Sequence, residues 1–213
     1  MLGVDSQGAE AYFSVMLVRR QRAPLHALTP HVEKIVAAIV VLLKEAKRRG
    51  LPATQYDIVK SLFLADRGHL NKYGRPITFD NYVAMKDGPV PSLAYNFLKE
   101  DATSLRRHGQ KLPWRRKAAR DLGVRAFAFE IESDNVDTSV LSPSDVEELK
   151  AAFTIVKALG FRQVRKLTHE DQAYIEAWED DGPSNGYKMS LSLLFDVPNE
   201  ELAGELAFLS KHS

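Results

Sequence analysis

The sequence predicts a mainly α (α+β) fold: a compact helical domain of about six to seven helices with a small two- or three-stranded antiparallel sheet. Several segments place apolar residues at helical spacing directly after a capping residue, whereas only residues 81–86 and 124–132 have the length and pattern of strands. The chain has 213 residues, of which 45% are hydrophobic and 27% charged. This length and balance are typical of a globular protein with one well-buried domain.

The first predicted helix follows an N-terminal extension. Residues 1–28 carry little core potential, so we expect the helical domain to occupy residues 29–213. Thr29-Pro30 has the N-cap and N1 pattern of a helix that runs to about Arg49. Basic residues in its last turn suit the negative end of the helix dipole, and Gly50 is expected to end it.

A second helix is predicted from Thr54, because Thr54 and Asp57 have the spacing of a capping box. Apolar residues and His69 recur along one face, which is expected to be buried. A histidine on such a face is more often a hydrogen-bonded core residue than a ligand. Tyr73-Gly74-Arg75-Pro76 ends the helix, because glycine tolerates a positive φ angle and proline cannot continue the helical hydrogen bonds. Outside the apolar face, and expected to face water, are Lys60, Ser61 and Arg67.

The middle of the chain is predicted to hold the short sheet. Residues 81–86 suit a strand that is closed by Gly88-Pro89-Val90-Pro91, and Ser92 is placed to cap the next helix. Residues 99–123 are interpreted as a polar loop or a frayed helix. The alternating segment 124–132 is the best strand candidate and can pair with the strand before the Gly-Pro stop.

The last third of the chain is predicted to be helical. Ser142-Pro143 opens a long helix that is expected to end at Gly160, and a shorter helix follows it. Thr168 and Asp171 repeat the capping spacing before a further helix. After a loop, Pro198 starts the final helix.

Three short motifs occur in order between residues 58 and 90. They are Ile58-Val59-Lys60-Ser61-Leu62-Phe63-Leu64-Ala65 with His69-Leu70, then Tyr73-Gly74-Arg75-Pro76-Ile77, and then Ala84-Met85-Lys86-Asp87-Gly88-Pro89-Val90. Their order and spacing resemble those of the Panacea domain, the SocA-like antitoxin domain formerly catalogued as a phage-associated protein family of unknown function. Leu167-Thr168-His169 is a weaker echo of the same family. Val59 and Met85 stand where the family usually has Gln and Trp.

The resemblance implies an antitoxin, a protein that neutralises a protein toxin encoded beside it, usually by forming a direct complex. In one branch of the family the antitoxin acts instead as an adaptor that delivers its toxin to a protease. Direct inhibition requires only a preformed surface that covers the active site of the toxin or its substrate. An interface of this kind buries roughly 1,200 to 2,000 Å² and depends on a few aromatic or arginine anchors.

We place the candidate partner-binding surface on the second predicted helix and the turns that follow it. Its residues are Lys60, Asp66, Arg67, Tyr73, Arg75, Lys86 and Asp87. A structural role is an equally good interpretation for the turn residues, because aromatic and charged side chains often fix such turns. The expected partner is the cognate toxin, with a protease as a second partner if the protein is an adaptor.

A basic segment supports an alternative function. Residues 106–120 hold seven Lys or Arg residues and no acid, although the whole chain has a formal charge of only +1. Trp114 beside Arg115, Arg116 and Lys117 suits phosphate contact combined with base stacking, so the protein could be a nucleic-acid-binding regulator. A solvated segment balanced by neighbouring acidic residues is the more common meaning of such a charge run. Docking to an acidic protein surface is a third use.

The sequence lacks the patterns of an enzyme active site. None of the six histidines has metal-motif spacing, and neither a Gly-x-Gly-x-x-Gly pattern nor a phosphate-binding loop occurs. Asp66 and His69 lie one helical turn apart, yet no serine or cysteine nucleophile belongs with them. We therefore expect a binding protein, not an enzyme, with no catalytic residues, no metal site and no cofactor.

Composition also indicates a compartment. The chain contains no cysteine, which is typical of proteins in the reducing cytoplasm. The charge order at the N-terminus does not suit a signal peptide, and no segment reaches the roughly 20 apolar residues that span a bilayer. A prophage accessory protein that binds a host factor without any toxin is a further alternative.

Overall fold

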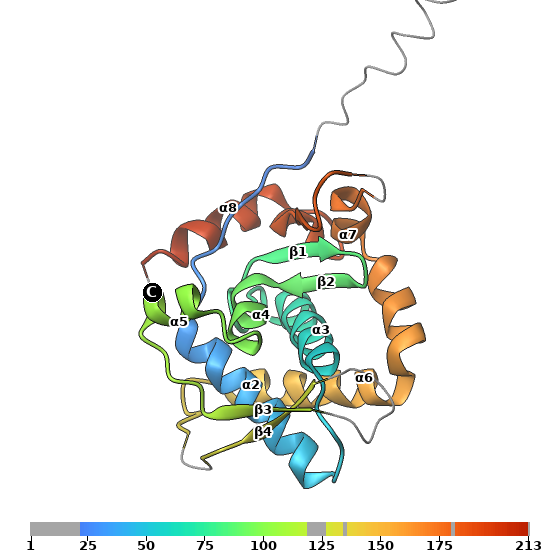
Figure 1. Cartoon of the computed structure of the whole chain (residues 1–213). Helices are drawn as coiled ribbons and strands as arrows, with labels where there is room; N and C mark the ends of the chain where they lie inside the picture. Colours follow the sequence, from blue (N-terminus) through green and yellow to red (C-terminus); the bar gives the residue numbers. More distant parts are fainter. Residues whose placement is uncertain (1–21, 119–126, 134–135, 180–181, 213) are drawn as a thin grey trace, which may run out of the picture.

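The computed structural model describes residues 22–118, 127–133, 136–179 and 182–212. Within these ranges the chain forms seven α-helices, a short 3-10 helix and two small antiparallel sheets (Figure 1). The predicted class, mainly α with a small sheet, is confirmed. One apolar cluster surrounds helix α2 (Val32–Arg48), and a second lies under the C-terminal helices.

Helix α2 runs through the larger cluster. Every residue from Ile35 to Leu43 is buried, because other elements cover the helix on more than one side. The predicted cap at Thr29 is wrong, since His31 occupies the N-cap position. The backbone N–H of His31 instead donates to the carbonyl oxygen of Thr78 at 3.1 Å, so the helix begins later than expected.

Helix α3 (Gln55–Tyr73) has the predicted capping box. The Asp57 N–H donates to Thr54 Oγ1 at 3.1 Å, and the Thr54 N–H donates to Asp57 Oδ2 at 2.9 Å. Gly74 ends the helix with a φ of 77°, as predicted. His69 is 1% exposed and hydrogen-bonded, which confirms the core position expected for it.

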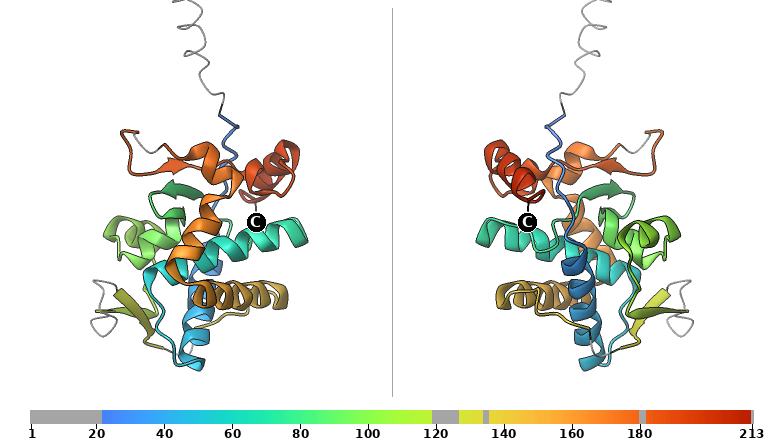
Figure 2. Two further views of the ribbon diagram at one scale, coloured as in Figure 1. Left: turned by 90° about the vertical axis from the view of Figure 1, so that its right-hand side faces the viewer. Right: turned by 90° about the vertical axis from the view of Figure 1, so that its left-hand side faces the viewer.

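Helix α6 (Pro143–His169) opens with a second predicted capping box, between Ser142 and Asp145. Gly160, with the non-helical torsions φ 68° and ψ 177°, interrupts it, which confirms the helix end predicted there and the further helix predicted after it. The first half runs beside α3, and these two helices share the most extensive contact among the described elements (Figure 2). The second half rises toward the three-stranded sheet (Figure 1).

Strands β1 (Tyr82–Met85) and β2 (Gly88–Pro91) form a tight hairpin, and β5 (Tyr187–Lys188) pairs with the other edge of β1. The segment that was predicted only to close the first strand is therefore itself a strand. Its two prolines are compatible with pairing because β2 lies at the edge of the sheet.

The second sheet pairs β3 (Trp114–Ala118) with β4 (Phe127–Ile131). The pairing proposed between the alternating segment and the hairpin is therefore wrong. Residues 124–126 of that segment lie outside the described ranges. Residues 99–123, interpreted as a polar loop or a frayed helix, contain the short helix α5 (Ala102–His108) and also β3, which was not expected.

Helix α4 (Ser92–Leu98) begins at the predicted serine, but its cap comes from elsewhere. Asp80, which is buried, accepts the backbone N–H of Leu93 at 3.0 Å and of Ala94 at 2.8 Å. Burial raises the pKa of Asp80 to about 7, against the opposing effect of these N–H donors. The carboxyl group just before β1 thus fixes the helix that follows β2.

The second apolar cluster is enclosed by α7 (Gln172–Ala177), the 3-10 helix η2 (Leu191–Leu194) and α8 (Glu200–Leu209). Asp171 caps α7, whereas the Thr168 hydroxyl hydrogen-bonds within α6, so the capping box predicted at Thr168 is wrong. Leu28 is buried in the same cluster. Residues 1–21 of the predicted extension lie outside the described ranges.

Candidate functional site

The turn of the β1–β2 hairpin lies against α3. Lys60 Nζ on α3 donates a hydrogen bond to the carbonyl oxygen of Pro89 at 2.8 Å. Gly88 has a φ of 99°, and a Cβ atom added to it would lie 2.7 Å from Thr168 Oγ1 and 2.8 Å from Lys60 Nζ. Only glycine fits so close an approach, so the Gly-Pro sequence allows the turn to sit between α3 and α6.

Helices α6 and α7 hold the same turn. Arg165 Nη2 donates to the carbonyl oxygen of Lys86 at 3.1 Å, and Arg165 Nε lies 3.3 Å from Asp87 Oδ1. Tyr174 Oη donates to the carbonyl oxygen of Met85 at 3.0 Å. Motifs that are far apart along the chain therefore meet at one turn.

A pocket of about 370 Å³ opens beside this turn, and we call it the hairpin pocket. Its walls come from the start of α3, the hairpin, α4 and β4. The lining residues are Thr54, Gln55, Tyr56, Val59, Lys60, Met85, Lys86, Asp87, Gly88, Val90, Tyr95 and Phe127. Pockets for small ligands range from roughly 300 to 1,000 Å³, so this one has room for one or two side chains. Half of the lining residues are aromatic or aliphatic, and Lys60 is among the others, with its Nζ 5.5 Å from the centroid of the Tyr56 ring.

Lys60 is a buried cation at this pocket. Its side chain is 1% exposed, and burial lowers its pKa to about 7; the charge of Asp87 opposes this shift and that of Arg165 reinforces it. Among the described residues, no carboxylate lies within ion-pair distance of Lys60 Nζ, whose hydrogen bond goes to a backbone carbonyl. Such a charge is costly to bury, because the Tyr56 ring, 5.5 Å from Nζ, and the charge of Asp87 offset only part of the desolvation.

Aromatic side chains border the pocket. The Tyr56 and Phe161 rings lie 4.7 Å apart between centroids, and Tyr56 Oη donates to the carbonyl oxygen of Phe161 at 3.2 Å. Phe161 is 51% exposed and Phe127 is 39% exposed. The guanidinium of Arg116 lies 3.4 Å from the centroid of the Phe127 ring. Exposed aromatic rings around a pocket, with arginine beside them, are the residue types that anchor protein interfaces.

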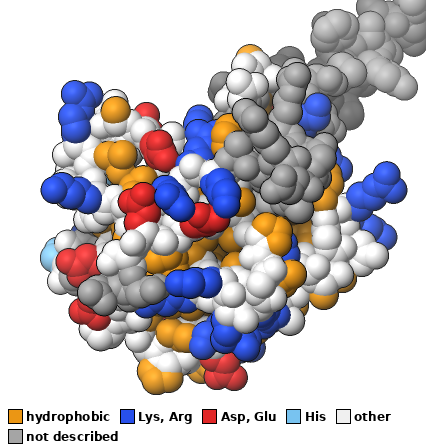
Figure 3. All heavy atoms as spheres, turned by 60° about the horizontal axis from the view of Figure 1, so that its bottom comes forward, with side chains coloured by type: hydrophobic (Ala, Val, Ile, Leu, Met, Phe, Trp, Pro, Cys, Tyr) orange, Lys and Arg blue, Asp and Glu red, His pale blue; other side chains and the backbone are white. Residues whose placement is uncertain are grey.

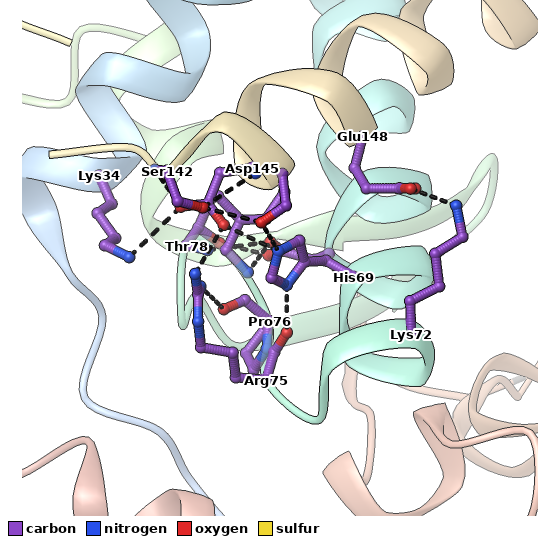
Figure 4. Close-up of polar contacts among 12 residues, drawn as sticks. Lys34, His69, Lys72, Arg75, Pro76, Thr78, Ser142, Asp145 and Glu148 are labelled. Carbon is purple, nitrogen blue, oxygen red and sulfur yellow. Dashed lines mark hydrogen bonds and ion pairs between the residues drawn. The ribbon is translucent and has the colours of Figure 1, made fainter. Parts of the chain in front are cut away.

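A second polar cluster lies where the turn after α3 meets the start of α6 (Figure 4). Asp145 Oδ1 lies 3.0 Å from both Arg75 Nη2 and His69 Nε2, and the Ser142 N–H donates to Asp145 Oδ2 at 2.9 Å. Burial acts to raise the pKa of Asp145, but the Ser142 N–H and the charges of Arg75 and Lys34 outweigh it and lower that pKa. The cluster fastens the Tyr-Gly-Arg-Pro turn to α6.

The same cluster brings a serine, a histidine and an aspartate together without forming a relay. Ser144 Oγ and Asp145 Oδ1 both approach Nε2 of His69, at 3.1 Å and 3.0 Å, while Nδ1 faces the carbonyl oxygen of Arg75 at 2.8 Å. In a nucleophile–base–acid triad the serine and the aspartate bind different ring nitrogens. This geometry therefore orients a turn and does not activate Ser144.

The residues proposed for partner binding do not share one surface. Lys86 and Asp87 are exposed at the hairpin turn. At the other end of α3, Tyr73 is 52% exposed, its ring lies tilted against that of His69, and Arg75 binds Asp145. Near that end, the remaining proposed cation, Arg67, pairs with Asp171 at 2.7 Å and Asp196 at 3.0 Å.

Three residues are more buried than the sequence suggested. Lys60 and Ser61, expected to face water, are 1% and 0% exposed, because the hairpin and α6 cover the polar side of α3. Asp66, placed on the partner surface, is 2% exposed. Its carboxylate accepts the backbone N–H of Ile77 at 2.8 Å and the hydroxyl of Tyr82 at 2.8 Å, and burial raises its pKa. Asp66 is therefore a buried residue that stabilises the chain just after the Tyr-Gly-Arg-Pro turn.

The basic segment is divided between two elements: residues 106–108 end α5, and residues 114–118 form β3. Trp114 is 3% exposed, so the base stacking proposed for it is not available in this structure. Arg115 and Lys117 lie 3.1 Å and 2.9 Å from the carboxylate of Glu130 on β4, which agrees with the expected balance by acidic residues. Figure 3, which brings the lower face of Figure 1 forward, shows basic side chains interspersed with acidic and apolar ones. Residues 119–120 of the segment lie outside the described ranges.

Sequence reasoning missed the residues that border the hairpin pocket. Tyr56, Phe161 and Phe127 come from three segments, and no pattern along the chain shows that they meet. Arg165 was missed as well. It lies two residues before Leu167-Thr168-His169, the weaker family motif, and contacts Asp87 at the Gly-Pro turn.

The described residues hold neither a metal-binding cluster nor a membrane-spanning helix. These residues contain no group of three or more His, Cys, Asp or Glu side chains arranged to hold a metal ion. No helix that they form combines the length and the apolar character needed to span a bilayer.

Comparison with known families gives one match. The family model described as "Antitoxin SocA-like, Panacea domain" matches residues 58–175, more than half of the chain. The matched range contains the hairpin, the Tyr-Gly-Arg-Pro turn and both halves of α6. No curated protein and no solved structure matches the chain significantly.

Proposed function

The chain belongs to the SocA-like antitoxin family with the Panacea domain, and from this premise we propose that it neutralises a cognate protein toxin by direct binding. It would act in the cytoplasm, in keeping with its lack of cysteine. It would do so by occluding the toxin, making and breaking no covalent bond itself.

The observation that carries this proposal is the surface around the hairpin pocket. Phe127 lines the pocket and Phe161 packs on Tyr56 in its wall, and both rings are exposed beside a turn that the family motifs hold in place. A rigid aromatic rim loses little conformational entropy on binding, which favours tight association. We therefore centre the toxin interface on this rim, with Lys86 and Asp87 at its edge.

Co-expression tests this function. A small open reading frame encoded beside this chain should arrest growth when expressed alone, and the chain should restore growth and co-purify with the product. Phe161→Ala should weaken the complex by about 2 kcal/mol, roughly 30-fold in Kd, and reduce rescue. The matched control is Phe208→Ala on α8, because Phe208 is also exposed, at 63%, and lies away from the pocket lining.

The outcomes separate the alternatives. Absence of any adjacent toxic product, or failure to rescue growth, would count against an antitoxin. Rescue accompanied by a shortened toxin half-life that depends on a host protease would indicate the adaptor mechanism. Rescue lost with Phe208→Ala but kept with Phe161→Ala would move the interface to α8. The nucleic-acid alternative has less support, because Trp114 is buried and two of the cations are paired with Glu130.

A further inference from the structure

The hairpin pocket contains a lysine, Lys60, that has no carboxylate within ion-pair distance among the described residues, although its Nζ lies 5.5 Å from the centroid of the Tyr56 ring. Lys60 Nζ makes one hydrogen bond, to the carbonyl oxygen of Pro89, and its ammonium can donate three. The acidic residue nearest in the lining is Asp87, whose carboxylate lies 3.3 Å from Arg165 Nε and is therefore already engaged. A structural lysine at this depth would be expected to pair with a carboxylate.

The surroundings of the pocket add positive charge and apolar surface. Lys86 lines the turn, Arg165 lies behind Asp87, and Arg116 covers Phe127. Against these cations the lining offers Asp87 as its carboxylate among the residues described. The pocket is thus complementary to a negatively charged group that carries apolar neighbours.

We propose that the hairpin pocket accepts the side-chain carboxylate of an acidic residue, flanked by apolar residues, from the protein that this chain binds. The proposal rests on the antitoxin function proposed above and specifies the chemistry of the partner. A carboxylate that reaches Lys60 Nζ completes its coordination and restores its charge in the bound state. The flanking apolar residues pack on the rings of Tyr56, Phe161 and Phe127.

Two observations favour a protein segment over a small free acid. The aromatic rim extends beyond the pocket to Phe161, which is not part of the lining, so the apolar surface is larger than the cavity. The volume of about 370 Å³ fits one or two side chains and leaves their backbone outside. Deeply set charged pairs surrounded by aromatic contacts are typical anchors of protein interfaces.

The lowered pKa of Lys60, about 7, supplies a readout that structural roles of the pocket would not change. A carboxylate bound at Nζ favours the protonated amine, so binding and proton uptake are linked, and each tenfold preference for the charged form raises the pKa by one unit. The other ionisable groups around this region are Tyr56 and Asp57 of α3, Lys86 and Asp87 of the turn, Tyr95 of α4, and Arg165 and His169 of α6. The titration must therefore be followed at Lys60 itself.

Two blocked peptides provide the test with the full-length protein. Ac-Leu-Glu-Leu-NH2 and Ac-Leu-Gln-Leu-NH2 have the same shape, no terminal charges, and differ only in the carboxylate. Each is titrated while the lysine side-chain NMR signals are recorded between pH 6 and 9. The Glu peptide should bind at least tenfold tighter than the Gln peptide at pH 6.5 and raise the Lys60 pKa by about one unit or more.

Variants assign the effect to one lysine. Lys60→Met should remove the preference for the Glu peptide, whereas Lys211→Met, which makes the same change in net charge at an exposed C-terminal position, should keep it. The wild-type measurements stand alone if Lys60→Met does not fold. Equal binding of the two peptides, or a Lys60 pKa that the Glu peptide leaves unchanged, overturns the proposal.

A third probe separates the two sources of a carboxylate. Acetate that binds as tightly as the Glu peptide, with the same shift at Lys60, would show a small-anion site and overturn the assignment to a protein segment. Because no toxin is used, these results are independent of the growth assay. If the chain rescues growth but binds the Glu and Gln peptides equally, the antitoxin function stands. Only the proposed binding of a partner carboxylate in the hairpin pocket is then rejected.

Discussion

Replacing Gly88 with alanine should destabilise the protein by about 2 to 5 kcal/mol. The added Cβ would lie 2.7 Å from Thr168 Oγ1 and 2.8 Å from Lys60 Nζ, closer than real Cβ contacts. Both neighbours are buried and hydrogen-bonded, so neither can move away freely. Overpacking of this kind costs about 1 to 3 kcal/mol. A φ of 99° adds about 1 to 2 kcal/mol for a residue with a side chain.

Gly74→Ala is the matched control, because Gly74 has a φ of 77° and an added Cβ would have no neighbour within 4 Å. It should show only the backbone cost of about 1 to 2 kcal/mol. Urea unfolding followed by circular dichroism measures both variants. In a chain of this size each kcal/mol shifts the melting temperature by about 2 to 4 °C, so thermal melts should separate them by several degrees.

A second-site variant tests the steric cause directly. Thr168→Ala removes the hydroxyl that the new Cβ would meet, so Gly88→Ala should cost less in that background than in the wild type. Equal losses for Gly88→Ala and Gly74→Ala, or strict additivity of Gly88→Ala and Thr168→Ala, would refute the close-approach argument.

Three further predictions concern charge. Asp145→Asn keeps a side-chain acceptor for the α6 cap but removes a buried charge, so it should cost about 3 kcal/mol or more at pH 7. Because the folded state lowers the pKa of Asp145, this stabilisation is present above the unfolded pKa of about 4 and is lost in acid. In the wild type, the free energy of unfolding should rise with pH above about pH 7 because of Lys60, and Lys60→Met should remove this rise. The folded pKa of about 7 lies below the unfolded value of about 10.4, so wild type gains up to about 1.4 kcal/mol per pH unit between them. Replacing Arg115 and Lys117 together with alanine should change the unfolding free energy by less than about 1 kcal/mol, because both are exposed to solvent.

Urea unfolding from pH 3 to pH 9 measures these effects. If the gap between wild type and Asp145→Asn stays constant down to pH 3, the lost charge is not its cause. If Lys60→Met keeps the wild-type slope above pH 7, the titrating group is another residue. If the Arg115 and Lys117 double variant folds normally but no longer rescues growth, the second sheet takes part in toxin binding.

Signals that depend on neighbours in sequence were sufficient for much of the helical part. The capping boxes at Thr54 and Ser142 form as predicted, because the side chain and the N–H groups it satisfies lie within one turn. Gly74 also ends α3 as expected, since a left-handed residue is a local requirement. At Thr168 the same spacing misled, because the hydroxyl had a carbonyl partner one turn earlier in a helix that was already formed.

Burial of polar residues could not be predicted from helical periodicity. The apolar stripe of α3 identifies one buried face, but the hairpin and the second half of α6 cover the opposite side, where Lys60 and Ser61 lie. Pairing of strands was equally nonlocal. The alternating segment was predicted to pair with the strand before the Gly-Pro stop, whereas it pairs with β3. That strand lies in a basic run in which Arg115 and Lys117 pair with Glu130 across the sheet.

At the candidate site, some residues could be identified from the sequence and others could not. The Gly-Pro turn and Lys60 were marked by the family motifs, although the contact between them was not visible in the sequence. The aromatic rim required Tyr56, Phe161 and Phe127 to be brought together from three elements. Such a surface exists only after the chain has folded.

The break in α6 bears on how this protein could diversify. Gly160 has torsions that are essentially restricted to glycine, and no neighbouring atom lies within 4 Å of where its Cβ would be. The direction of the second half of α6 is therefore set by the backbone torsions of Gly160. A change in these torsions would move Arg165 and Thr168 while Asp145, in the first half, kept its contacts. Evolution could thereby reshape one wall of the cavity, and so switch targets, without rebuilding the interior.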